Sequence, residues 1–174
     1  MTANAARDDL FSFLAELGIA TTTVPYPAHV SVEEGRARRG DLSGRFTKNL
    51  LLRDKKHQLY LIVAGEDQAL DLKTFHRLIG ARGRLSFADP AEMKTLLGVE
   101  PGALTPLGLI HDDRCAVRVV LDEALLEANV VNFHPLVNTE STSLKPHDLL
   151  RFIRATGHEP LLVRLSEPMS VDDA

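Results

Sequence analysis

The chain has 174 residues, of which 44% are hydrophobic and 25% charged, and its net charge at pH 7 is −4. These values are ordinary for a single globular domain and exclude a protein that binds polyanions over its whole surface. Its one cysteine excludes an internal disulfide, and no apolar run approaches the roughly 18 residues that span a membrane. Because the first residues also lack a signal-peptide pattern, we expect a cytoplasmic protein.

The first half of the chain predicts a mixture of helices and strands without strict alternation. Leucines at helical spacing before Gly18 predict a helix over residues 4–17, and a strand follows over 19–26. The capping-box spacing of Ser31 and Glu34 predicts a short helix that ends near Gly40. Apolar runs on both sides of the charged turn 54–57 predict a hairpin of strands 46–53 and 58–64. A helix over 70–79 and a short strand over 85–88 complete this half.

The second half is also mixed. Asp89 and Pro90 are typical of a helix start, which predicts a helix through residue 97 with Gly98 as its end. Pro146 opens a last helix, which ends before Gly157. The remaining expectations are strands over 107–110, 116–121, 130–133 and 161–165, a helical turn at 125–126, and a loop or short strand over 138–143. Together they predict one mixed α/β (α+β) domain over residues 1–165 and a frayed tail over 166–174.

Positive charge is concentrated in one stretch of the chain. Residues 36–56 hold eight Lys or Arg against two Asp, a local charge of +6, so the remaining residues sum to −10. Such asymmetry favours an anionic partner that meets one face of the protein. The alternative is a solvated, charged edge strand, because edge strands commonly carry lysine.

Three polar segments follow or begin apolar strands, where sites on rigid scaffolds are usually found. They are 48–49, 102–106 and 132–141, and we expect them to converge. Lys48 could hold a phosphate, or lose its proton readily if it is buried. Gly102 could present its backbone N–H to an oxyanion, and His134, held extended by the proline after it, could point into a cleft. The competing interpretations are an edge-strand lysine, an ordinary proline-bounded loop and a structural histidine.

Several kinds of site find no support. No metal-binding motif or glycine-rich nucleotide motif occurs, so we expect neither a metal nor another cofactor. Cys115 precedes a predicted buried strand and lacks the context of a nucleophile, and residues 112–114 are most simply a turn. Residues 80–83 imitate the GxxG loop of KH RNA-binding modules, but the flanking pattern does not fit that module.

Taken together, the polar segments resemble the YbaK/prolyl-tRNA-synthetase-associated domain family, and most closely its free-standing ProXp-ala (PrdX-like) members. Residues 47–56, 101–109 and 133–139 carry the resemblance, in the order of the family. It implies a YbaK-like mixed α/β domain built on a curved, largely antiparallel sheet flanked by helices, without a metal. It also implies a trans-editing aminoacyl-tRNA deacylase, and the Lys-Asn pair and the Phe-His-Pro segment favour mischarged Ala-tRNA(Pro) as substrate.

The resemblance also implies roles for individual residues. The expected catalytic residues are Lys48, Asn49 and His134. The expected substrate-binding residues are Gly102, Ala103, Leu104, Thr105, Pro106 and Asn138. The basic stretch adds a predicted tRNA-binding set of Arg45, Arg53, Lys55 and Lys56.

Other functions remain open at this point. The same basic face would suit a non-catalytic module that binds the tRNA acceptor stem, and other family members remove a different small amino acid such as cysteine. A hydrolase of another small ester or thioester is a third interpretation, with Lys48 on a substrate phosphate. The expected partner is the acceptor end of aminoacyl-tRNA(Pro), with transient contact to the translation machinery. We expect no membrane contact and a monomer, because no long exposed apolar stripe occurs.

Overall fold

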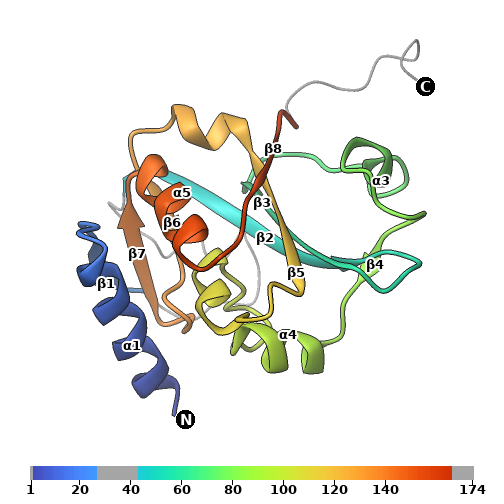
Figure 1. Ribbon diagram of the computed structural model, residues 1–174. Helices are drawn as coiled ribbons and strands as arrows, with labels where there is room; N and C mark the ends of the chain where they lie inside the picture. The colour runs from blue at the N-terminus through green and yellow to red at the C-terminus, as the bar shows by residue number, and fades with distance from the viewer. Residues whose placement is uncertain (1, 27–42, 166–174) are drawn as a thin grey trace.

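The structure is a computed structural model that describes residues 2–26 and 43–165 (Figure 1). The predicted helix at 31–40 and the predicted tail at 166–174 lie outside these residues. The helices are α1 (Ala3–Glu16), α3 (Phe75–Leu78), α4 (Pro90–Leu97) and α5 (Pro146–Ala155), with 3-10 helices η1 (Pro106–His111) and η2 (Glu123–Glu127). The strands are β1 (Thr22–Pro25), β2 (Arg45–Arg53), β3 (Leu59–Gly65), β4 (Ser86–Phe87), β5 (Val117–Asp122), β6 (Val131–Phe133), β7 (Glu140–Leu144) and β8 (Leu161–Val163).

The described strands form one eight-stranded sheet. Seven of them follow the order β1-β7-β6-β2-β3-β5-β8, and the eighth, β4, pairs with β2. Most of the paired residues are antiparallel, as in the β2–β3 hairpin, while β2–β6, β3–β5 and β5–β8 are parallel. This arrangement confirms the predicted mixed α/β domain with a largely antiparallel sheet flanked by helices.

Two apolar cores cover the two faces of the sheet. The larger core joins α1, α4, α5 and η1 to one face, through side chains such as Leu10 and Phe152. The smaller core packs α3, through Phe75 and Ile79, against the other face. Every residue of β3 is buried, because this strand lies between the two cores. Figure 1 shows α1 at one end of the molecule and α3 at the other.

Strand β2 has neighbours on both edges, which corrects the interpretation of an edge strand. It pairs with β3 along residues 47–53. On its other edge it pairs with β6 only at Arg45 and Phe46, and with β4 only at Leu52 and Arg53. The charged residues of β2 therefore lie on an interior strand, and their charge does not serve to protect an edge.

Elements with clear capping or turn residues were predicted correctly from the local sequence. The helices at α1, α4 and α5 and the β2–β3 hairpin are confirmed within one or two residues. Asp89 and Glu92 form a capping box with Pro90 in the first turn, and Gly98 ends α4 with a positive φ of 69°. The short strand predicted at 85–88 is confirmed as β4, and the open choice at 138–143 is resolved as strand β7.

Two predictions were wrong. Residues 107–110 form the 3-10 helix η1 and not a strand, because the Thr105 hydroxyl caps the amide of Leu107 and Pro106 occupies the first turn. Only Phe75–Leu78 of the predicted helix 70–79 is helical. The Asp71 carboxylate accepts hydrogen bonds from the Lys73 amide and the Thr74 hydroxyl, and this local turn competes with a helix there.

The predicted simple turn at 112–114 contains a buried carboxylate, that of Asp112. Asp112 is 2% exposed and accepts hydrogen bonds from the amides of Ala116 and Val117. Its carboxylate also contacts the ring of His158 at 2.8 Å, and this ring contacts the Thr156 hydroxyl at 2.9 Å. These contacts join the end of α5 to the start of β5, so Asp112 is part of the core and not merely a turn residue.

Candidate active site

Lys48 lies within the sheet. Its partner on β3 is Ala64, which belongs to the core on the α3 face. The ammonium nitrogen Nζ donates a hydrogen bond to the backbone carbonyl of Gln68. Burial lowers the pKa of Lys48 below its ordinary value of 10.5, because the ammonium group has lost part of its hydration. A half-buried cation held in this way can meet an anionic group at a defined position.

Asn49 points to the opposite face, since successive side chains of a strand alternate. Its partner on β3 is Val63, which lies in the larger core. The amide nitrogen Nδ2 donates to the carbonyl of Leu104 at 3.1 Å. The amide oxygen Oδ1 is buried and accepts no hydrogen bond from any residue that the structure describes. Such an acceptor is costly to bury, so it marks a place where a ligand donor would be stabilised.

The polar backbone of β2 faces a gap between β6 and β4. Arg45 N–H donates to the Val130 carbonyl at one end of this edge, and the Leu51 carbonyl accepts from Ala88 N–H at the other. Because alternate residues direct their backbone groups to the same edge, those of Asn49 also face it, between these two bonds. The sheet therefore opens beside the two polar residues of β2.

The loop 102–106 reaches Asn49 through the carbonyl of Leu104. Gly102 has a φ of 92°, which glycine adopts without strain, and its Cα faces Asn138: a Cβ added there would lie 3.7 Å from the Asn138 amide nitrogen. Thr105 and Pro106 are buried at the start of η1. The loop thus contacts Asn49 through the Leu104 carbonyl and brings Gly102 near Asn138.

His134 follows β6, which runs parallel to β2. Phe46 is opposite Asn132 in this pair, and Lys48 and His134 each follow two residues later, beyond the paired residues. The imidazole Nδ1 lies 2.9 Å from the carbonyl of Glu140, and the ring packs edge-on against Tyr26 with centroids 5.7 Å apart. Among the hydrogen bonds of the described residues, none joins His134 to Lys48 or Asn49.

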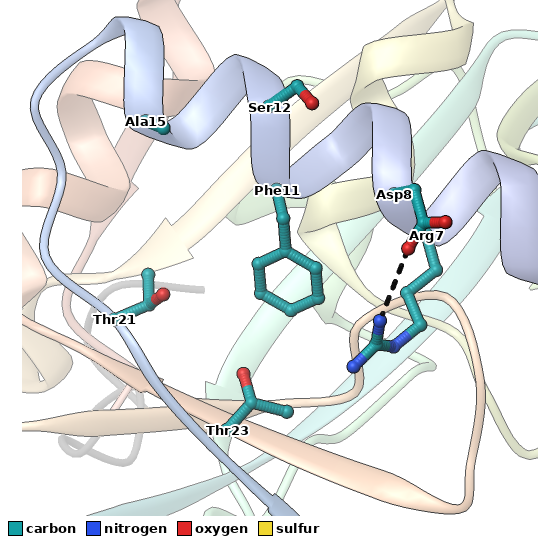
Figure 2. Close-up of a pocket in the computed structure, with 7 residues that line it drawn as sticks. All are labelled: Arg7, Asp8, Phe11, Ser12, Ala15, Thr21 and Thr23. Carbon is teal, nitrogen blue, oxygen red and sulfur yellow. Dashed lines mark hydrogen bonds and ion pairs between the residues drawn. The ribbon is translucent and has the colours of Figure 1, made fainter.

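Two hollows lie near the larger core. One, of about 490 Å³, is lined by residues of α1 and α4 and of the loops 98–103 and 136–139, and includes Ala103, His111 and Asn138. The other, of about 670 Å³, lies between α1 and β1; Figure 2 shows Phe11 and Arg7 pointing from the helix toward Thr23. Neither is lined by Lys48 or His134. Of the predicted substrate-binding residues, Ala103 and Asn138 face the first hollow.

The predicted tRNA-binding residues are spread along β2. Arg45 lies at one end, where its guanidinium covers the backbone of Gly65. Arg53 lies at the other end and forms an ion pair with Glu92 at 3.1 Å. Lys55 and Lys56 are exposed in the hairpin turn. About 26 Å of strand separates Arg45 from Arg53, so these residues do not form one patch.

Sequence reasoning missed three contacts of the candidate residues. Gln68 holds Lys48 through its carbonyl, while its side chain donates to the Leu165 carbonyl at 2.8 Å. Tyr26 packs on His134, and the buried Asn132 bridges Ser43 and Ser143. Backbone carbonyls carry no residue-type signal, so the Gln68 contact could not be read from the sequence.

Side chains able to bind a metal do not gather in this region. Among the described residues, no group of three or more His, Cys, Asp or Glu side chains could hold a metal ion. Within residues 2–26 and 43–165, no helix has the length and apolar character that a membrane crossing needs.

Comparison with known proteins connects this arrangement to a family. The family model described as the aminoacyl-tRNA editing domain matches residues 27–152. Prolyl-tRNA synthetase associated domain-containing protein 1 of Mus musculus is 37% identical over 167 residues, which cover 94% of this chain and 98% of that protein. The prolyl-tRNA editing protein ProX of Acetoanaerobium sticklandii is 34% identical over 154 residues, which cover 88% of this chain and 93% of ProX.

Solved structures agree on the fold. The crystal structure of a proposed trans-editing enzyme for prolyl tRNA synthetase superposes with a TM-score of 0.70. The two chains are 24% identical, and the superposition covers 97% of this chain and 99% of the other. At this identity, the match shows a shared fold.

Proposed function

This chain belongs to the aminoacyl-tRNA editing domain family, and on that premise we propose that it is a trans-editing deacylase that hydrolyses mischarged Ala-tRNA(Pro). The substrate would be the ester between alanine and the terminal ribose, and the products would be alanine and free tRNA. The curated relative ProX is named as a prolyl-tRNA editing protein, which supports the reaction class.

The observation that carries the proposal is the pair of contacts made by neighbouring residues of β2. Lys48 brings a half-buried cation to one face of the strand. Asn49 brings a buried, unused acceptor to the other, beside the carbonyl of Leu104. A substrate that presents both a phosphate and a hydroxyl or ammonium donor, as the aminoacylated 3′ end of tRNA does, would satisfy both groups at once.

Ester hydrolysis requires little further chemistry. A water molecule attacks the ester carbonyl, the tetrahedral intermediate collapses, and the ribose oxygen leaves with a proton. The free ribose hydroxyl can position the attacking water. In this scheme Lys48 neutralises the terminal phosphate, while Asn49 and His134 orient the ribose or the water. No covalent enzyme intermediate is needed, because the aminoacyl ester is already activated.

The loop 102–106 can supply donors for the oxyanion that forms during attack. Ala103 N–H already donates to the Glu100 carbonyl, and Leu107 N–H to the Thr105 hydroxyl. Pro106 has no N–H, so the amides of Gly102, Leu104 and Thr105 are the candidates for this role among the described residues of the loop. Gly102 also leaves the loop open to a close approach of the substrate carbonyl.

Selectivity for alanine follows from size. A synthetase pocket built for proline gains only about 1–3 kcal/mol per methylene over a smaller amino acid, so it cannot reject alanine by binding alone. A second site that admits alanine but not proline hydrolyses the error and leaves the correct product intact.

The experiment is deacylation of tRNA(Pro) charged with Ala, Cys, Ser or Pro, measured for the wild type, Lys48→Ala and Asn49→Ala. We expect rapid loss of alanine, little loss of proline, and a rate reduced by about 10²-fold or more in each variant, the size seen when one transition-state contact is removed. Lys73→Ala and Asn129→Ala, which change exposed residues elsewhere, are matched controls and should retain the wild-type rate.

Other outcomes distinguish the competing functions. Preferred hydrolysis of Cys-tRNA(Pro) would reassign the substrate. Binding of tRNA without hydrolysis of any ester would contradict the deacylase and favour a non-catalytic acceptor-stem module. Full activity of Lys48→Ala with unchanged binding would remove Lys48 from the mechanism.

A further inference from the structure

The most exposed large apolar side chain of the described structure lies next to a group of exposed cations. Phe87, on the short strand β4, is 61% exposed. It pairs with Leu52 of β2, and its neighbour Ser86 pairs with Arg53, the last residue before the hairpin turn. Figure 1 shows β4 and this turn together at the end of the molecule opposite α1.

Lys55, Lys56, Arg82 and Arg84 surround this end of the molecule, and all four are exposed. None of them forms an ion pair with another described residue. Arg53, by contrast, is neutralised by Glu92. Four like charges held close together repel each other, so this group is stabilised when an anion binds.

The cations are held by a rigid scaffold. The buried carboxylate of Asp54 accepts hydrogen bonds from the amides of Lys56, Gln58 and Arg82. The amide of Lys55 donates to the carbonyl of Arg82 at 3.1 Å, which ties the hairpin turn to the loop 80–84.

Gly83 permits the close approach of this loop to the hairpin. Its φ is 85°, and a Cβ there would lie 2.7 Å from Cδ of Lys55, so the lysine stem packs directly on the glycine. Lys55 is thereby held against the loop that carries Arg82 and Arg84. The backbone that carries these cations, and the stem of Lys55, are therefore fixed before any ligand arrives, which lowers the entropy cost of binding.

We propose that Phe87 with Lys55, Lys56, Arg82 and Arg84 forms an RNA-binding platform that contacts the acceptor arm several nucleotides from the aminoacylated end. An exposed aromatic ring offers a stacking surface for a base, and the adjacent cations match phosphates spaced along a strand. The proposal rests on the deacylase function and names where that enzyme would hold the body of its substrate.

The position along β2 determines which part of the RNA is reached. Phe87 is level with Leu52, four residues from Lys48, which is about 13 Å of strand. Stacked nucleotides rise by about 3.4 Å each. With the ester near Lys48, the ring therefore reaches a base about four nucleotides away, where the unpaired 3′ end meets the stem. Both Phe87 and Lys48 lie on the α3 face of β2, since their register partners Leu52 and Ala64 belong to that core.

The test compares a long and a short substrate. Alanyl-tRNA(Pro) reaches the platform, whereas alanine esterified to the trinucleotide CCA is too short. We expect Phe87→Ala to raise KM for the tRNA about tenfold, the effect of losing one stacked base. Its kcat/KM for the trinucleotide should remain at the wild-type value. Phe87→Trp should retain stacking, and Leu161→Ala, a truncation of an exposed apolar residue on β8, should change neither substrate.

The salt dependence of tRNA binding tests the role of the platform cations. We expect Lys55→Ala with Arg82→Ala to lower the slope of log K against log salt for uncharged tRNA(Pro) by about 1.5–2, one phosphate contact for each cation lost. The double variant Lys73→Ala with Lys145→Ala removes the same charge elsewhere and should keep the wild-type slope.

Failure of the platform proposal and failure of the deacylase proposal would give different results. If Phe87→Ala and the platform double variant act on and bind tRNA like the wild type, the platform is excluded while the deacylase stands. If the wild type hydrolyses no ester, the deacylase fails, and binding of uncharged tRNA still decides whether the platform exists.

Discussion

The environment of the Lys48 ammonium group is set by the position of this residue in strand β2. Its ammonium group is half-buried on an interior strand and bonded to a backbone carbonyl, and burial lowers its pKa. An exposed lysine of the same sequence context would be an ordinary surface charge. The protein accepts a cost in stability here, because the charged form is less well solvated in the folded chain than in the unfolded chain.

This cost predicts a pH dependence of stability. Between the lowered folded pKa and 10.5 the unfolded chain binds more protons at Lys48, so its penalty persists at neutral pH and disappears as pH rises through that interval. We expect Lys48→Met to be more stable than the wild type near pH 7, with a difference that shrinks toward pH 10.5.

The measurement is urea unfolding over this pH range, with an NMR titration of the lysine side chains. Lys73→Met is the control and should not gain stability in this way. Titration of Lys48 together with the surface lysines would contradict the expectation.

At the scale of elements, the Asp54 carboxylate joins the β2–β3 turn to the loop 80–84 through hydrogen bonds. Burial would raise the pKa of this carboxyl, but hydrogen bonds from the amides of Arg82, Gln58 and Lys56 and from the Tyr60 hydroxyl outweigh it and lower the pKa. The ionised carboxylate is therefore the form that the fold stabilises.

We expect Asp54→Asn to lower the free energy of unfolding at pH 7 by about 2–3 kcal/mol, because an amide offers one acceptor where the carboxylate offers two. The carboxylate's contribution is present above its unfolded pKa and is lost as pH falls through the lower folded value. The difference between variant and wild type should thus narrow below about pH 4. Denaturant unfolding at several pH values measures it, and Asp113→Asn, at an exposed position, is the control. A difference that is the same at all pH values would show that Asp54 acts by packing alone.

At the scale of the whole molecule, β3 joins the two cores. Leu61 belongs to the larger core and Ile62 to the smaller one, and both are 0% exposed. Loss of either side chain removes packing on one face of the sheet. Because one strand carries both, neither core can unfold while the other keeps its strand.

We therefore expect Leu61→Ala and Ile62→Ala each to cost about 2–5 kcal/mol and to leave a single unfolding transition. Fluorescence of an extrinsic label and far-UV circular dichroism should report the same midpoint in both variants. Separate midpoints in Ile62→Ala would indicate that the smaller core is an independent unit.

Elements whose signals are local were predicted from the sequence alone. The capping box at Asp89 and Glu92, the positive-φ glycine after α4, and the charged turn of the hairpin involve residues a few positions apart. Hydrogen bonds and dihedral preferences over such short distances depend little on the rest of the chain, so these elements were predicted within one or two residues. The polar candidates Lys48, Gly102 and His134 were also found in this way, by residue type and position after strands.

What these residues contact depends on the tertiary structure. It placed Lys48 and Asn49 on opposite faces of β2, put β2 in the interior of the sheet, and divided its predicted tRNA-binding residues between the two ends of the strand. It also buried Asp112 beside His158 and brought the loop 80–84 onto the hairpin through Asp54. Each of these contacts depends on the sheet register or on backbone groups that are far apart in the chain. The free energy of such a contact depends on both segments, so it cannot be predicted from either segment alone.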